Sequence, residues 1–163
     1  MLVRSAMAVL LVGGCAPGTS LPADEPTPGE RRRVVVSSIV DGDTIRVGTE
    51  RIRLIGIDTP ELDSPEGIPQ CLAVAAARFT SRELEGRAVE LELDVDELDP
   101  YGRTLAYVWK GVRLFNETLV ERGLAEERPY PPNTKHQERL HAAEARARAA
   151  PRGIWGRCVS VPG

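Results

Sequence analysis

The chain has 163 residues, of which 42% are hydrophobic and 28% are charged, and its formal net charge is −3. This length supports one domain with a short appendage, and the composition is typical of a globular protein. Without residues 1–30, basic and acidic residues are nearly equal in number. That balance argues against a protein that coats nucleic acid with a broad basic face, but not against an enzyme that holds a few phosphates.

Residues 1–15 have the features of an export signal with a lipobox. Arg4 precedes an apolar run at 6–12 that is too short to span a bilayer. The small residues before Cys15 resemble the lipidation motif of bacterial lipoproteins, so we expect a lipid on Cys15 and a location at the outer face of the cell membrane. A plain secretory signal cleaved near Ala16, giving a secreted protein, and a wrongly assigned start codon are alternatives.

Residues 16–32 contain four prolines and little to bury, so we expect a disordered tether there. The folded domain is expected over 33–158, with a short tail at 159–163. Cys71 and Cys158 form an even pair in an exported domain, which suggests a disulfide, although two buried thiols are the alternative. No second cysteine is near either of them in the sequence, so no zinc site is expected.

Short β-branched and apolar runs separated by glycine-rich turns predict five strands in the folded part, at 33–40, 44–47, 51–57, 87–96 and 104–110. Unbroken stretches that end at glycine or proline predict three helices, at 71–85, at 115–122 and from a cap at 133–134 to 150. This order predicts an α+β fold: a five-stranded antiparallel barrel of OB type with about three helices. Such barrels often bind nucleic acid on one face.

Four acidic residues gather around the second and third expected strands. Asp43 begins one strand and Asp58 ends its neighbour, so the two carboxylates can meet across the sheet, with Asp41 and Glu61 close by. A hard cation such as Ca²⁺ prefers several oxygen ligands, and the Thr59 carbonyl adds a third. The pattern therefore indicates a site for a divalent cation.

Two arginines accompany this acidic group, Arg53 on the third expected strand and Arg103 before the fifth. Guanidinium groups hold phosphate oxygens in a forked geometry and stabilise extra negative charge on phosphorus. Glu61 is placed to orient or deprotonate a water molecule. Each element alone has an ordinary explanation: a hairpin turn at 41–44, a turn or helix start at 58–61, a structural ion pair for Arg53 and a strand-edge cation for Arg103. Their conjunction indicates phosphodiester hydrolysis.

The chain resembles the staphylococcal-type thermonuclease family over about residues 34–156. The resemblance is carried by six segments, at 41–44, 53–61, 101–107, 116–120, 123–125 and 154–155. It implies an OB-fold and Ca²⁺-dependent hydrolysis of DNA and RNA to 3′-phosphate products. We expect a monomer, with nucleic acid as substrate and no protein partner.

The resemblance also implies a role for each matching residue. The family's catalytic positions fall on Arg53, Arg103 and Glu61. Its metal ligands fall on Asp43, Asp58 and Thr59, with Asp41 supporting them, and its nucleotide-contacting tyrosines fall on Tyr101 and Tyr130. The chain departs from the staphylococcal enzyme at four positions, Asp63, Glu66, Pro100 and Arg128, which predicts weaker binding of nucleic acid because fewer phosphates are neutralised.

Two other functions fit the same composition. One is an inactive OB module that binds nucleic acid or protein at the cell surface, against which the retained acidic residues and arginines argue. The other is a surface lipoprotein with a vestigial site and a role in adhesion; the near-neutral charge is compatible with this function, but no sequence feature supports it. His136 and His141 are five residues apart, on different helix faces, so we interpret them as surface or packing residues.

Overall fold

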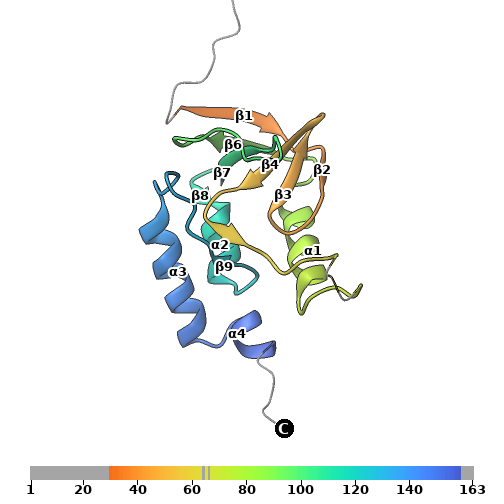
Figure 1. Ribbon diagram of the computed structural model, residues 1–163, viewed down its shortest axis with the longest axis vertical. Coiled ribbons are helices and arrows are strands. Elements are labelled where there is room, and N and C mark those ends of the chain that lie inside the picture. The colour runs from red at the N-terminus through yellow and green to blue at the C-terminus, as the bar shows by residue number, and fades with distance from the viewer. Residues whose placement is uncertain (1–29, 64, 66, 159–163) are drawn as a thin grey trace, which may run out of the picture.

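The computed structural model describes residues 30–63, 65 and 67–158. The expected lipobox with Cys15, most of the expected tether, and the tail at 159–163 lie outside these residues. Strands gather at one end of the domain and helices at the other (Figure 1). Within the described part, no helix has the length and apolar character needed to cross a bilayer.

Nine strands make up the β-structure: β1 (Arg31–Val35), β2 (Ser38–Ile39), β3 (Thr44–Val47), β4 (Glu50–Leu54), β5 (Ile57–Asp58), β6 (Ala88–Glu92), β7 (Thr104–Lys110), β8 (Arg113–Leu114) and β9 (Glu126–Glu127). The main sheet has the order β1-β6-β7-β4-β3-β2. β5 pairs with β9 in a separate two-stranded sheet, and β8 pairs with β7.

The two ends of the main sheet belong to one continuous segment, since only Val36 and Ser37 separate β1 from β2. The Val36 N–H donates to the Arg87 carbonyl beside β6, and the Ser37 N–H donates to the Arg46 carbonyl of β3. The path of paired strands therefore returns to the segment on which it began, as an OB-type barrel requires. Because Val36 and Ser37 bond to different strands, the strand expected at 33–40 is divided here into β1 and β2.

One pairing differs from the antiparallel barrel that we expected. β4 and β7 run parallel, with Arg53 opposite Leu105. A parallel neighbour requires a long crossover connection, and the chain between β4 and β7 supplies one through α1 and β6. The barrel is thus mixed, with antiparallel pairs elsewhere in the main sheet.

The folded part begins earlier than the expected boundary at residue 33. β1 starts at Arg31, in register with Glu92 of β6. The Arg32 guanidinium donates to both carboxylate oxygens of Glu50, at 2.9 and 2.8 Å. Residues 31 and 32 are therefore part of the barrel and not of the tether.

β6 ends at Glu92, four residues before the strand end that alternation predicts. The Glu92 carboxylate, expected on the solvent face, is buried and pairs with Lys135 at 2.5 Å. It also accepts a hydrogen bond from the Trp109 indole at 2.6 Å and lies 3.0 Å from Nε2 of His136. Beyond it, Val95 is 66% exposed, so the apolar alternation at 93–95 does not continue the buried face.

Four helices accompany the barrel: α1 (Ala73–Leu84), α2 (Phe115–Glu121), α3 (Gln137–Ala149) and the short α4 (Ile154–Arg157), which the sequence did not predict. α3 starts later than expected because Asn133 does not cap it. The Asn133 side chain instead exchanges two hydrogen bonds with the main chain of Asp96, at 2.7 and 2.8 Å.

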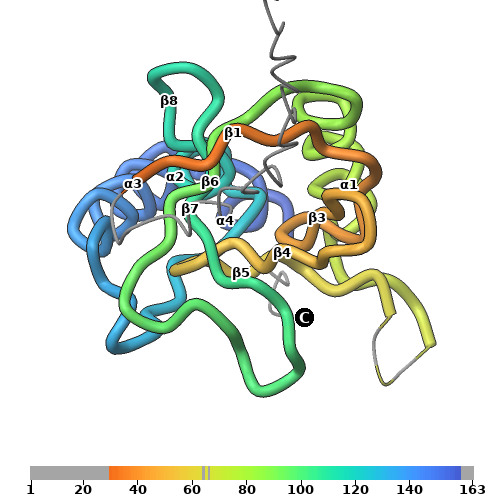
Figure 2. Tube along the Cα trace, turned by 90° about the horizontal axis from the view of Figure 1, so that it is seen from above, coloured from red at the N-terminus to blue at the C-terminus, as the bar shows by residue number. Residues whose placement is uncertain are grey.

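The core is mainly aliphatic, in keeping with an aromatic content of 4%. α2 lies below the strands in Figure 1 and behind β6 and β7 in the view from above (Figure 2), so it closes one end of the barrel. Its buried residues are Phe115, Asn116, Leu119 and Val120. Asn116 ties the helix to the sheet, since its amide donates to the Ile55 carbonyl at 2.8 Å. This contact fixes the turn between β4 and β5, which carry the site described next.

Candidate active site

Asp43 is the most buried carboxylate of the expected site, with 5% of its surface exposed. Its Oδ2 accepts hydrogen bonds from the Thr59 N–H at 2.7 Å and the Thr59 hydroxyl at 3.1 Å. Asp41 accepts a bond from the Asp43 N–H at 3.1 Å, so the hairpin turn holds both acids together. Burial raises the pKa of Asp43, Arg53 opposes this shift, and the charge of Asp41 adds to it.

Arg53 of β4 uses its guanidinium group to bridge Asp43, which precedes β3, and Asp58 of β5. Nη1 lies 2.5 Å from Oδ2 of Asp43, and Nη2 donates to Oδ1 of Asp58 at 2.9 Å. The Nη1 hydrogens are not directed at any acceptor, so the first contact is an ion pair and not an oriented hydrogen bond. The structure thus brings Asp43, Asp58, Thr59 and Arg53 together, as the strand pattern predicts.

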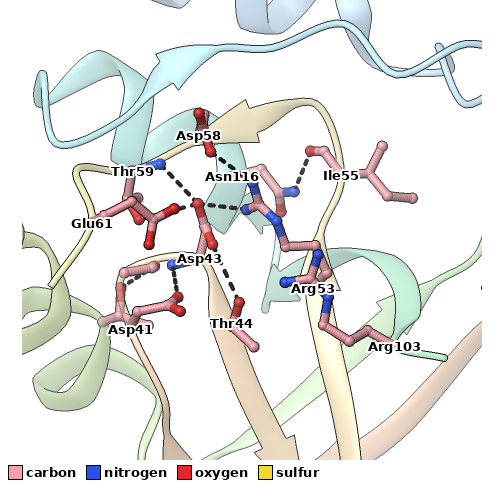
Figure 3. A network of polar contacts seen from close by, with 12 residues as sticks. Asp41, Asp43, Thr44, Arg53, Ile55, Asp58, Thr59, Glu61, Arg103 and Asn116 are labelled. Carbon is pink, nitrogen blue, oxygen red and sulfur yellow. Dashed lines mark hydrogen bonds and ion pairs between the residues drawn. The ribbon is translucent and has the colours of Figure 1, made fainter. Parts of the chain in front are cut away.

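Glu61 follows β5, and its carboxylate points toward Asp43 (Figure 3). Partial burial raises the pKa of Glu61, and the negative charges of Asp43 and Asp58 raise it further. Its main chain is held by Gln70, whose side-chain oxygen accepts from the Glu61 N–H at 2.8 Å and whose N–H donates to the Glu61 carbonyl at 2.9 Å. Gln70 is a positioning residue that sequence reasoning missed, because the contact spans a nine-residue loop.

Arg103 is held by Asp99, another residue to which the sequence analysis gave no role. The Asp99 carboxylate accepts from the Arg103 Nε at 2.5 Å and from the N–H groups of Tyr101 and Arg103, both at 2.9 Å. Burial alone would raise the pKa of Asp99, but these hydrogen bonds outweigh it and hold the pKa below its usual range. An aspartate two residues before Tyr101-Gly102 is the local signal for this turn.

Arg53 and Arg103 line one cavity of about 550 Å³ together with Tyr101, Arg128 and Tyr130. Tyr101 is 85% exposed, and the Arg103 guanidinium carbon lies 5.7 Å from the centre of its ring. Exposed aromatic rings beside two guanidinium groups suit a nucleotide, whose base stacks and whose phosphate is anionic. The two expected nucleotide-contacting tyrosines therefore share a cavity with both expected catalytic arginines.

Two further contacts hold the hairpin turn against its neighbours. The Thr80 hydroxyl of α1 donates to the Gly42 carbonyl at 2.7 Å. A Cβ at Gly42 would lie 2.7 Å from the Thr59 hydroxyl oxygen, so only glycine lets the turn approach Thr59 this closely. The turn at 41–44 is thus built into the site and is not an isolated hairpin.

Cys71 and Cys158 form a disulfide in the structure, with their Cα atoms 5.8 Å apart. Both cysteines line a cavity of about 460 Å³ that Asp58 and Thr59 also line. The disulfide thus ties the segment after α4 to the residues before α1, at the edge of the acidic cluster.

The donor chemistry of the cluster fits a hard divalent cation. In the residues that the structure describes, no three His, Cys, Asp or Glu side chains form a metal-binding group. The expected ligand set has two carboxylates, from Asp43 and Asp58, and Thr59 would add a main-chain carbonyl. Asp43 and Asp58 lie close enough to share one guanidinium, and Asp41 and Glu61 add negative charge around them.

The protein is therefore an OB-type barrel that carries an acidic pair, Asp43 and Asp58, beside two arginines, Arg53 and Arg103. Residues 51–157 match the model of the family described as staphylococcal nuclease homologue. The chain is 44% identical over 124 residues to a thermonuclease of Staphylococcus hyicus, covering 74% of this chain and 73% of the relative. It is 42% identical over 127 residues to a thermonuclease of Staphylococcus intermedius, covering 76% of each chain.

An endonuclease of Bacillus subtilis strain 168, YncB, is 32% identical over 130 residues, which cover 76% of this chain and 62% of the relative. The chain belongs to the staphylococcal nuclease homologue family. This confirms the family that the sequence motifs indicated, and with it the OB-fold.

Proposed function

We propose that this family member, a nuclease that hydrolyses phosphodiester bonds, is an exported enzyme that cleaves both DNA and RNA with Ca²⁺ and leaves 3′-phosphate ends. The observation that carries the proposal is the shared guanidinium of Arg53, which contacts buried Asp43 and partly exposed Asp58 and lines a cavity with Arg103. Carboxylates for a cation and guanidinium groups for a phosphate thus meet at one place.

The cation would be held by Asp43, Asp58 and the Thr59 carbonyl. When bound, it supplies positive charge that neutralises the phosphate and favours ionisation of a water molecule. The ion pairs of Arg53 with Asp43 and Asp58 set the position of its guanidinium near the phosphate. Asp41 supports Asp43 through the hydrogen bond within the turn.

Glu61 accepts the proton of the attacking water. Its raised pKa makes it a stronger base than an ordinary glutamate, and the Gln70 contacts fix its main chain. The water oxygen bonds to phosphorus, the bond between phosphorus and the 5′-oxygen breaks, and the leaving oxygen takes up a proton from solvent, to which Glu61 later releases its own. Arg53 and Arg103 stabilise the negative charge that accumulates on the phosphoryl oxygens. The phosphate then remains on the 3′-oxygen of the upstream fragment.

Export is supported by the signal-like residues 1–15 and by the disulfide, because disulfides persist in oxidising compartments. We propose a lipid on Cys15 that holds a monomeric enzyme at the outer membrane face. Replacing Cys15 with Ser should release the protein from washed membranes and abolish its labelling by a radioactive fatty acid. Unchanged labelling of Cys15→Ser would refute the anchor.

The catalytic proposal is tested with purified protein on single-stranded DNA, duplex DNA and RNA, in Ca²⁺, in Mg²⁺ or in chelator. We expect cleavage of all three substrates with Ca²⁺, none in chelator, and product 3′ ends that incorporate label from a polymerase only after phosphatase treatment. Activity with Mg²⁺ but not Ca²⁺ would refute the metal assignment. Absence of cleavage by the folded protein with either metal would refute the proposed reaction and favour an OB module that only binds.

A further inference from the structure

A third cavity is larger than the two that hold the arginine pair and the disulfide. It has a volume of about 940 Å³ and lies between α2, the β8 hairpin, α4 and the residues before α1. Five arginines line it: Arg113, Arg122, Arg139, Arg152 and Arg157. We call this cavity the arginine groove.

The positive charge of the arginine groove is only partly neutralised. Its two acidic residues are engaged, since Glu117 pairs with Arg139 at 2.5 Å and Glu121 pairs with Arg146 at 3.5 Å. Arg152 donates to the main-chain carbonyl of Glu121 at 3.3 Å, which fixes the guanidinium without cancelling its charge.

The other three arginines of the groove, Arg113, Arg122 and Arg157, have no carboxylate partner within the described residues. Arg122 stacks over Phe79 with its guanidinium carbon 4.7 Å from the ring centre, so its charge is also uncancelled. A concentration of unpaired guanidinium groups is unexpected on a chain whose formal net charge is −3. It indicates a site for a polyanion, because guanidinium groups pair with phosphate in a forked geometry.

The arginine groove adjoins the proposed active site through the disulfide. Leu72 and Arg157 line the groove, whereas their neighbours Cys71 and Cys158 line the second cavity together with Asp58 and Thr59. A strand whose scissile phosphate lies at the acidic cluster can therefore run past the disulfide into the groove.

We propose that the arginine groove is an exosite that holds phosphates of the substrate strand away from the scissile bond. The inference rests on the proposed nuclease function and extends it, because it makes affinity depend on substrate length. An anionic membrane is the less favoured ligand, because membrane-surface sites combine basic residues with an apolar face. Among the described residues that line the groove, Val112, at 91% exposure, is the one exposed large hydrophobic side chain, so the groove has no apolar face of that kind.

The test compares the chain with the double variant Arg113→Ala/Arg157→Ala and with Arg87→Ala, an exposed arginine outside the three cavities described. Cleavage kinetics are measured on a single strand of roughly 30 nucleotides and on a dinucleotide. At about 50 mM salt, we expect the double variant to raise KM for the long strand about tenfold, and to reduce the slope of log affinity against log salt by about 1.4. Its kcat/KM on the dinucleotide and all parameters of Arg87→Ala should stay within about twofold, because surface charges act locally in salt.

Equal effects of the double variant on long and short substrates, or an unchanged KM for the long strand, would overturn the exosite. Loss of binding to phosphatidylglycerol vesicles with unchanged KM would assign the groove to lipid and overturn the proposal as well. A conservative Arg113→Lys/Arg157→Lys variant, which keeps both charges, should recover most of the affinity and shows that folding is not the cause.

If the unmodified chain cleaves neither substrate, the proposed function fails, and fluorescence anisotropy of the labelled long strand tests the groove alone. Weaker binding by the alanine double variant would then support the groove as a nucleic-acid site, and equal binding would overturn it.

Discussion

Asp99 offers a test of how the structure positions Arg103, the second of the two proposed catalytic arginines. Its carboxylate accepts three hydrogen bonds from the turn at 99–103, including one from the Arg103 side chain, and its side chain is 3% exposed. Replacing Asp99 with Ala leaves two main-chain N–H groups without their acceptor and frees the Arg103 guanidinium. Each lost contact costs about 1–3 kcal/mol, so we expect a loss of about 3 kcal/mol in the free energy of unfolding.

The variant Asp99→Asn tests the main-chain hydrogen bonds of the turn separately from the charge pair with Arg103. The amide oxygen still accepts from the two main-chain N–H groups, but the charged partner of Arg103 is lost, so unfolding should change by only about 1 kcal/mol. We expect kcat to fall about tenfold in Asp99→Asn and about 100-fold in Asp99→Ala, because a displaced guanidinium no longer meets the phosphate. Urea unfolding and cleavage kinetics measure the two effects. Full kcat in folded Asp99→Ala would refute a positioning role for Asp99.

The remaining predictions concern stability and the hairpin turn. Cys158→Ser opens a disulfide that joins residues 87 positions apart, and urea unfolding should show a loss of about 4–5 kcal/mol, whereas an unchanged midpoint would mean that the bond does not form in solution. Burial would raise the pKa of Glu92, but its hydrogen-bond donors outweigh burial and lower the pKa. Glu92 therefore stabilises the fold above its unfolded pKa of about 4.3, and this contribution is lost as the pH falls through the lower folded pKa. Glu92→Gln should therefore be less stable by about 3 kcal/mol at pH 7, with a difference that shrinks in acid; a difference independent of pH would contradict this. Gly42→Ala should lose about 1–3 kcal/mol and most activity, because its Cβ would displace Thr59; full activity of this variant would show that the turn can give way.

Much of the site could be predicted from the sequence because its signals are local. Asp43 and Asp58 fall at a strand start and a strand end, and strand alternation puts Arg53 on the face opposite the buried Ile52 and Leu54. β3 and β7 were predicted to the residue, since short β-branched runs between glycine turns leave little freedom. Here the pattern of neighbouring residues and the packing of the barrel favour the same structure.

The sequence failed where a distant contact decides the outcome. Asn133 is a good helix cap by type, but its amide is satisfied by Asp96, and the helix therefore starts later. Glu92 was expected in solvent by alternation, but Lys135, which precedes α3, and Trp109 of β7 stabilise its buried carboxylate. The arginine groove could not be predicted either, because its five arginines are spread from position 113 to 157 and converge only in the fold.

Glu61 is the proposed base of the phosphodiesterase reaction, and its role is central to the proposed mechanism. The most direct measurement is kcat of Glu61→Gln on single-stranded DNA in Ca²⁺, with Arg87→Ala as the control and urea unfolding to check the fold. Because Glu61 is only partly buried and the substitution keeps its size, we expect stability to change by less than about 0.5 kcal/mol while kcat falls about 100- to 10,000-fold. A Glu61→Gln variant that cleaves within about threefold of the unmodified chain would contradict this assignment of the base.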